Sequence, residues 1–120
     1  MHVTFRVAGA GAPANGNTLA GMTDLIFTHE RERSRYALRC GDDLLGVLDY
    51  VDDGGTVAMT RAFTTPTFRG NGYAAVLVER AVAELEAAGD RRISPVCWYV
   101  AEWFDAHPER AGILQERPAS

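Results

Sequence analysis

The stretch FTTPTFRGNGYA, residues 63–74, joins a strand pattern to a helix pattern and decides the fold. Before it, residues 56–64 form an extended run, TVAMTRAFT, which predicts a β-strand. After it, residues 72–88 place apolar side chains at three- and four-residue steps, and Gly89 follows. That spacing predicts an amphipathic helix of four to five turns that ends at this glycine. The junction is therefore a glycine-rich turn that opens a helix.

This turn has the components of a diphosphate site. Helix N-termini expose unpaired N–H groups and a partial positive charge, so they attract phosphates. Gly70 and Gly72 let the backbone approach a ligand closely, and Arg69 adds a permanent charge. A glycine-rich turn can also exist for steric reasons alone, and that alternative stays open. The Gly-Lys-Ser/Thr of a Walker A loop is absent, and antiparallel strands before the turn argue against a dinucleotide fold.

The region before the junction divides into short strands separated by turn signals. The turns Gly41-Asp42-Asp43 and Asp52-Asp53-Gly54-Gly55 are short enough to join neighbouring strands. They predict an antiparallel meander of four strands over residues 24–29, 34–40, 44–51 and 56–64.

After the first helix, residues 91–95 predict a brief strand, and Val96 to about His107 predict a second helix. Pro95 suits a helix start, and Pro108 ends the pattern. The fold class is therefore α+β, with a mixed, mostly antiparallel sheet of about five strands and two helices. We expect a flexible N-terminal extension over residues 1–21, a domain over residues 22–110 and a C-terminal tail over residues 111–120.

Composition sets limits on what the domain binds. A chain of 120 residues fits one domain, and a net charge of −4 is unsuited to binding nucleic acid non-specifically. No apolar run is long enough to cross a membrane, and no secretory signal is seen, so we expect a cytoplasmic protein without nucleic-acid or membrane partners. Cys40 and Cys97 lie far apart and lack the spacing of a disulfide framework or a metal site.

The junction resembles motif A of the GCN5-related N-acetyltransferases, which reads Arg-x-x-Gly-x-Gly/Ala with a proline three residues before the arginine. Here Pro66 and Arg69-Gly70-Asn71-Gly72-Tyr73-Ala74 match it. Pro95-Val96-Cys97 and His107-Pro108 further resemble a compact single-domain branch with a Pro-x-Cys motif. The resemblance covers most of residues 23–109. Ala62, where the branch often has threonine, and Thr64-Thr65, where it has Val-Pro, depart from the pattern.

The resemblance implies how acetyl-coenzyme A binds. The backbone around Phe63 and Thr64 is expected to pair with the pantetheine arm like an extra strand. The amides of Arg69, Gly70, Asn71, Gly72, Tyr73 and Ala74 are expected to hold the diphosphate. The strands before and after the first helix are expected to splay apart, which leaves a notch for the thioester and the amine.

Acyl transfer to an amine needs a proton for the departing thiolate and polarisation of the thioester carbonyl. Cys97 is expected in the first turn of the second helix, where free N–H groups stabilise an oxyanion. Its thiol would protonate the leaving thiolate or carry the acyl group; equally, Cys97 is a small core residue. Tyr99 is the alternative acid, because many relatives use a tyrosine on this helix. Packing within an aromatic stretch is the other interpretation of Tyr99.

Other polar residues are weaker candidates. His107 is a candidate base, and the alternative interpretation is that it caps the end of the second helix. His29 is expected to be a solvated strand-end residue at the start of the charge run His29–Arg33. Asp49 and Glu102 are candidate carboxylates for an amine.

The sequence thus predicts an N-acetyltransferase that uses acetyl-coenzyme A and an amine acceptor. An acyl-coenzyme A-binding module without turnover is the alternative, and an interaction domain that has lost its ligand is a third. A homodimer is also an expectation, since so short a domain leaves sheet edges open. An ordered strand at Met1–Val7 is another way to cover an edge.

Overall fold

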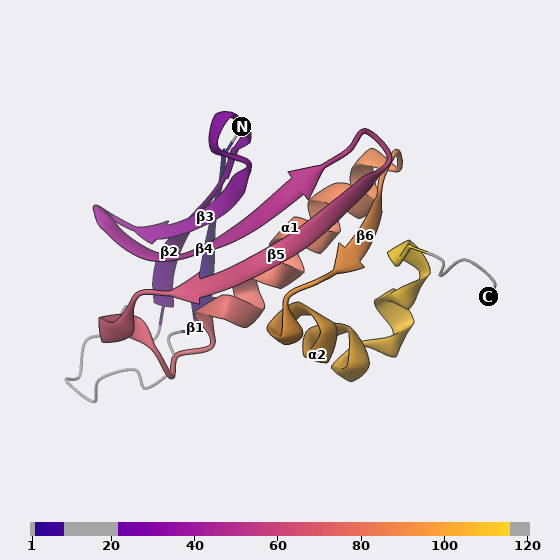
Figure 1. The fold of residues 1–120 in the computed structure, drawn as a ribbon. Coiled ribbons are helices and arrows are strands. Elements are labelled where there is room, and N and C mark those ends of the chain that lie inside the picture. Colours follow the sequence, from indigo (N-terminus) through magenta and orange to yellow (C-terminus); the bar gives the residue numbers. More distant parts are fainter. Residues whose placement is uncertain (1, 9–21, 116–120) are drawn as a thin grey trace.

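The computed structural model describes residues 2–8 and 22–115, which form a strongly twisted sheet with two helices (Figure 1). Six strands lie in the sheet in chain order. They are β1 (His2–Ala8), β2 (Met22–Glu30), β3 (Arg35–Cys40), β4 (Asp43–Asp52), β5 (Thr56–Thr64) and β6 (Arg92–Pro95). The helices are α1 (Tyr73–Ala88) and α2 (Trp98–Ala106), and 3₁₀ turns cover Arg31–Arg33, Pro66–Phe68 and Pro108–Ile113.

The sheet is antiparallel from β1 to β5, and β6 joins it parallel to β5. This confirms the α+β fold and the predicted meander. The turn between β4 and β5 has the expected chemistry, because Asp53 Oδ1 accepts from the N–H groups of Gly55 and Thr56 at 2.9 and 2.7 Å. A parallel neighbour needs a long crossover, and α1 supplies it between β5 and β6.

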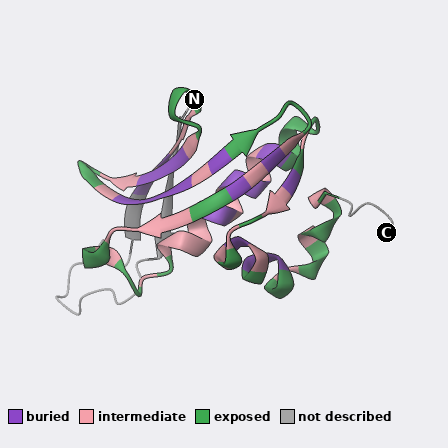
Figure 2. Ribbon diagram, viewed as in Figure 1, coloured by how far each residue is buried: buried purple, intermediate pink, exposed green. Residues whose placement is uncertain are grey.

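Helix α1 covers one face of the sheet, and the core lies between them (Figures 1 and 2). Its buried side chains follow the predicted spacing: Leu77, Val78, Ala81, Val82 and Leu85. They meet buried residues of four strands, among them Leu38, Leu48, Met59 and Ile93. Each fully buried aliphatic side chain contributes about 1.5–3 kcal/mol relative to exposure, so this face holds the helix in place. Gly89 ends α1 in the left-handed conformation, as predicted.

The two ends of the domain differ from the expected limits. Residues 1–21 were expected to lie outside the domain, yet His2–Ala8 pairs with Met22–Thr28 as an antiparallel edge strand. Residues 9–21 and 116–120 of the expected extension and tail lie outside the described residues. The tail was expected from residue 111, but Leu114 bridges Ile93, and the Gln115 N–H donates to the Ile93 carbonyl at 2.8 Å.

The second helix begins two residues later than its sequence pattern predicts. Pro95 is the last residue of β6, and the Cys97 N–H donates to the Met59 carbonyl of β5 at 2.8 Å. This bond holds Cys97 in an extended conformation, with φ −68° and ψ 132°, so it is the N-cap of α2 and not part of the first turn. Sheet pairing thus delays the start of the helix until Trp98.

Candidate functional site

The edge of β5 is open along its second half. Strand β6 pairs with β5 only from Thr56↔Arg92 to Met59↔Pro95, and the Cys97–Met59 bond follows directly. Beyond that point the chain turns away into α2, and the two strands separate (Figure 1). No described strand lies against Thr60–Thr64 on this side.

The hydrogen-bond pattern shows which backbone groups the open edge presents. On the β4 side, the Thr65 N–H donates to the Leu45 carbonyl at 2.9 Å. Because backbone groups of an antiparallel strand point alternately to its two sides, those of Ala62 and Thr64 face the open edge. The Thr64 carbonyl already accepts a long contact of 3.4 Å from Arg69 Nε. The edge therefore offers donors and acceptors to an extended ligand.

The open edge leads into the glycine-rich turn. A 3₁₀ turn, Pro66–Phe68, reverses the chain, and Asn71 Nδ2 donates to the Phe68 carbonyl at 3.0 Å. Gly70 and Gly72 have φ of +87° and +77°, a conformation that favours glycine. A Cβ at either position would meet no atom within 4 Å. The glycines are thus required by backbone conformation, and the space beside them is empty.

Helix α1 begins at this turn without a cap. Gly72 is its N-cap, no side chain caps it, and the first turn holds no acidic residue. The first helical bond is Val76 N–H to the Gly72 carbonyl at 3.2 Å. Within the described chain, the N–H groups of Tyr73, Ala74 and Ala75 have no backbone partner. The positive end of the helix is therefore available to an anion.

The predicted binding residues Phe63, Thr64, Arg69, Gly70, Asn71, Gly72, Tyr73 and Ala74 are thus continuous along one edge and one helix end. Phe63 is half-buried, and its ring lies under the Arg61 guanidinium at 4.9 Å. Arg69 is exposed beside the turn. The arrangement suits a ligand that combines an extended amide-containing arm with a phosphate group.

The predicted catalytic residues lie where β5 and β6 part. Cys97 is a half-buried free cysteine packed against the core, at the N-terminus of α2. Tyr99 is half-buried two residues further on, with its ring edge-on to Trp98 at 5.9 Å. Burial, and then the nearby Glu102 carboxylate, raise the pKa of Tyr99. A tyrosine is protonated at neutral pH already at its ordinary pKa, so the hydroxyl carries a proton, and the raised pKa makes it a weaker acid.

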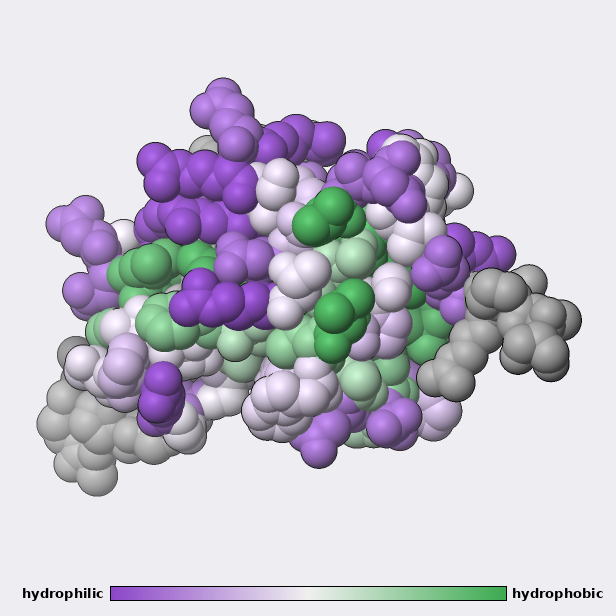
Figure 3. Space-filling view, viewed as in Figure 1, coloured by the Kyte–Doolittle hydropathy of each residue, from purple (hydrophilic) through white to green (hydrophobic). Residues whose placement is uncertain are grey.

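Exposed apolar side chains flank Cys97 in the sequence. Val96 and Trp98, on either side of Cys97, are 62% and 71% exposed, and Val51 is 60% exposed. Figure 3 shows one face of the molecule, where small apolar patches lie among polar side chains. The surface next to Cys97 is thus apolar.

The other candidate residues are engaged elsewhere. His107 Nδ1 lies 2.7 Å from the Trp103 carbonyl, and its ring stacks on Trp103 at 4.1 Å, so it caps α2. Asp49 is paired with Arg61 Nη1 at 3.5 Å. Glu102 is exposed on α2.

His29 was expected to be solvated, and this prediction is wrong. Its side chain is only 8% exposed and lies 2.8 Å from Glu84 Oε2 of α1. The sequence carried a signal for this: His29 falls on the same alternation as Leu25 and Phe27, whose side chains are buried. The contacts with Glu84 and Tyr50, by contrast, join positions far apart in the chain.

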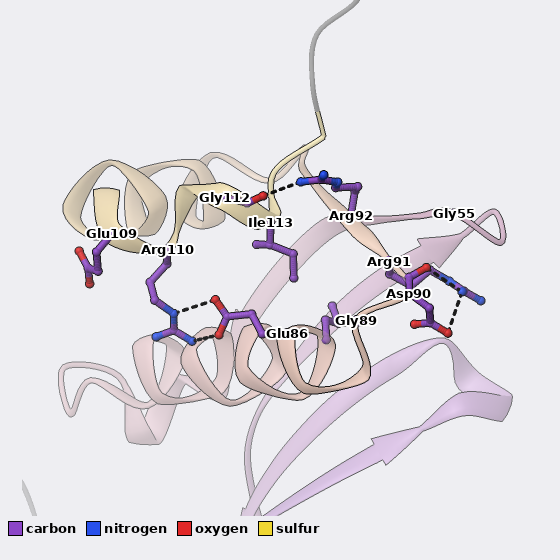
Figure 4. Close-up of a pocket in the computed structure, with 11 residues that line it drawn as sticks. Gly55, Glu86, Gly89, Asp90, Arg91, Arg92, Glu109, Arg110, Gly112 and Ile113 are labelled. Atoms are coloured by element: carbon purple, nitrogen blue, oxygen red, sulfur yellow. Dashed lines mark hydrogen bonds and ion pairs between the residues drawn. The ribbon is translucent and has the colours of Figure 1, made fainter.

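A cavity of about 530 Å³ lies at the other end of the molecule. It is formed by the end of α1, the start of β6 and the 3₁₀ turn Pro108–Ile113 (Figure 4). Four of its charged side chains form ion pairs: Arg110 with Glu86 at 2.7 Å, and Arg91 with Asp90 at 3.3 Å. It contains none of the residues that the sequence singled out, so we place the candidate site at the β5 edge.

Two further observations concern the described residues as a group. Their histidine, cysteine and carboxylate side chains include no set of three that would hold a metal ion. Neither α1 nor α2 is long and apolar enough to cross a membrane.

Comparison with known proteins agrees with this geometry. A family model described as GCN5-related N-acetyl-transferase matches residues 35–113, from the start of β3 to the end of the last 3₁₀ turn. Comparison with curated proteins gives no significant match.

Proposed function

Because the chain belongs to the GCN5-related N-acetyltransferase family, we propose that it transfers an acetyl group from acetyl-coenzyme A to an amine. The observation that carries the proposal is the continuity of two features. The open edge of β5 runs directly into the uncapped N-terminus of α1, with empty space beside Gly70 and Gly72. An arm of amides that ends in a diphosphate matches both features.

In this proposal each part of the cosubstrate has its own residues. The N–H and C=O groups of Ala62 and Thr64 pair with the pantetheine amides, as a neighbouring strand would. The N–H groups at the start of α1 bind the diphosphate, and Arg69 leaves the Thr64 carbonyl to add its charge. Bound acetyl-coenzyme A supplies an activated thioester carbonyl.

The chemistry is expected at the point where β5 and β6 part. The neutral amine nitrogen bonds to the thioester carbon and gives up a proton, the carbon–sulfur bond breaks, and the departing thiolate takes a proton. Tyr99 carries such a proton as a neutral phenol, and after giving it to the thiolate it accepts the proton that the nitrogen loses. Burial, and then Glu102, raise the pKa of this hydroxyl. Cys97, at the helix N-terminus, is the second candidate donor or an acyl carrier.

A second candidate function is binding of an acyl-coenzyme A without turnover, and the positions of two histidines favour it. His29 and His107 are both held by contacts away from the open edge. Neither of these two histidines is therefore placed to act as a base at the open edge.

Titration calorimetry with acetyl-coenzyme A, followed by release of free thiol in the presence of an amine panel, separates these functions. Binding with thiol release and an acetylated amine supports the transferase. Binding without thiol release across the panel supports the module, and no binding contradicts both functions.

Mass spectrometry of the protein after a single turnover tests the role of Cys97: an acetylated Cys97 indicates a covalent intermediate. Full turnover by Cys97→Ala would contradict a catalytic role there.

A further inference from the structure

A second cavity, of about 110 Å³, lies under the C-terminal half of α1, away from the cradle at its N-terminus. Strands β2, β3 and β4 form its floor, and Glu84 and Ala88 of α1 form part of its roof. A cavity of this size holds a small organic molecule, since an engineered cavity of about 150 Å³ accommodates benzene.

One wall is an aromatic cluster with a fixed hydrogen-bond arrangement. His29 Nε2 lies 2.6 Å from the Tyr50 hydroxyl, and its ring stacks on Tyr36 at 4.3 Å. Its Nδ1 lies 2.8 Å from Glu84 Oε2. The histidine is thus held between two strands and the helix.

The Tyr36 hydroxyl in this cluster has no partner. Tyr36 is fully buried and lines the cavity, and its hydroxyl forms no hydrogen bond within the described chain. Buried polar groups are nearly always hydrogen-bonded, and leaving one unpaired is unfavourable. A bound molecule that reached this hydroxyl would supply the missing hydrogen bond.

The charges around the cavity favour a positively charged head group. Three carboxylates line it, Glu84, Asp52 and Asp90, against two guanidiniums, Arg31 and Arg91. Arg91 is already paired, with Asp52 at 2.9 Å and with Asp90 at 3.3 Å. Glu84 contacts His29, and burial lowers the pKa of this histidine, although Glu84 opposes the effect. With His29 neutral, the charged side chains that line the cavity sum to −1, from three carboxylates and two guanidiniums.

The remaining wall is apolar. Val57, Leu85 and Ala88 line it, so the cavity has a hydrocarbon side as well as a polar one. A bound molecule is therefore expected to have a short aliphatic body and a single polar end.

From this combination, we propose that the cavity binds a small aliphatic primary amine as its ammonium ion. The three N–H donors of the ammonium are directed at Tyr36, Tyr50 and Glu84, and the alkyl group lies against Val57, Leu85 and Ala88. The site is separate from the β5 edge, so the proposal does not depend on acetyl transfer.

The test is a titration of the full chain with propylamine at neutral pH, followed by NMR of the histidine side chains. 1-Propanol and propionate are the neutral and anionic probes of similar size, and ionic strength is matched. We expect propylamine to shift the His29 resonances saturably, with a millimolar dissociation constant, and to leave those of His107 unchanged. 1-Propanol is expected to bind several-fold more weakly, and propionate not to bind.

Three variants identify the groups responsible. Glu84→Gln removes the charge and is expected to weaken propylamine binding about tenfold, while Tyr36→Phe removes the hydroxyl and weakens it several-fold. Glu86→Gln is the matched control, because Glu86 also lies on α1 but is paired with Arg110 outside this cavity. The proposal is wrong if propylamine gives no saturable shift of His29, which would indicate water alone. Equal binding of all three probes, or an unchanged affinity in Glu84→Gln, would also overturn it.

Discussion

Arg69 carries a permanent charge where the open strand edge meets the helix end, and its side chain is exposed. We predict that Arg69→Ala weakens acetyl-coenzyme A binding about tenfold, because one charge-assisted contact to phosphate contributes about 1.5–3 kcal/mol before solvent screening. Titration calorimetry at low and high salt measures this, and the difference from wild type is expected to shrink as salt rises.

Arg61→Ala is the matched control for this change. Arg61 is also an exposed arginine of the same region, 61% accessible, but it pairs with Asp49 and lies over Phe63. Its loss is expected to change the affinity for the cosubstrate much less. Equal effects of the two substitutions would show that Arg69 acts only through overall charge.

His29 gives the protein a pH-dependent stability. Burial lowers its pKa, Glu84 opposes this, and Arg31 adds to it. A base whose pKa is lower in the folded state binds protons more readily when unfolded, so stability falls as pH drops below about 6.5. We predict that urea unfolding midpoints decrease more steeply in wild type than in His29→Gln between about pH 7 and about pH 5. Parallel pH profiles would show that His29 is not the titrating group.

At this scale the sequence predicted the conformation of the glycine-rich turn better than the position of Cys97. Gly70 and Gly72 follow from local backbone needs, and both have the positive φ that a tight turn requires. The position of Cys97 depends on a hydrogen bond to Met59, which is distant in the chain, so helix periodicity alone placed it wrongly inside the helix. The Tyr36 hydroxyl shows the same limit, because its lack of a partner depends on the whole cluster.

At the scale of elements, β4 and β5 approach closely at Gly46. A Cβ there would lie 2.6 Å from the Phe63 carbonyl oxygen, which is backbone and cannot move without shifting β5. We predict that Gly46→Ala destabilises the fold by about 1–3 kcal/mol, the usual cost of overpacking. It is also expected to weaken acetyl-coenzyme A binding, because the displaced segment includes the open edge.

Thermal unfolding and calorimetry of this variant test the prediction, with Gly112→Ala as the control. Gly112 has ordinary backbone angles, and a Cβ there meets nothing within 4 Å. A stable Gly46→Ala protein with normal binding would mean that the two strands adjust without cost.

Sequence patterns predicted the elements well where local chemistry determines them. The Asp-Gly turns, the alternation of β3 to β5 and the spacing of α1 all match the structure. Predictions failed where pairing between distant segments decides: Leu114 beside Ile93, and the delayed start of α2. For β1 the sequence offered both a flexible extension and an ordered edge strand, and the pairing with β2 decides between them. These contacts depend on the assembled sheet.

For the whole molecule, the N-terminal strand is the clearest test of where the domain begins. Strand β1 pairs with β2 along Met22–Thr28. We predict that deleting residues 1–21 lowers the unfolding free energy by roughly 1–3 kcal/mol, because β2 then becomes an uncovered edge. Urea denaturation of the shortened and full chains measures it. An unchanged midpoint would mean that the domain starts at residue 22, as its sequence first indicated.

The unpaired half of β5 also has a consequence for how the protein behaves in solution. A bare strand edge is a template for another chain, and proteins normally restrain such edges by keeping them short or charged. Here the bare segment is only Thr60–Thr64, and Arg61 projects from it. If the cosubstrate pairs with this edge, the bound cosubstrate also shields the edge from other chains. Protein stored with coenzyme A is therefore expected to aggregate more slowly than protein stored without coenzyme A.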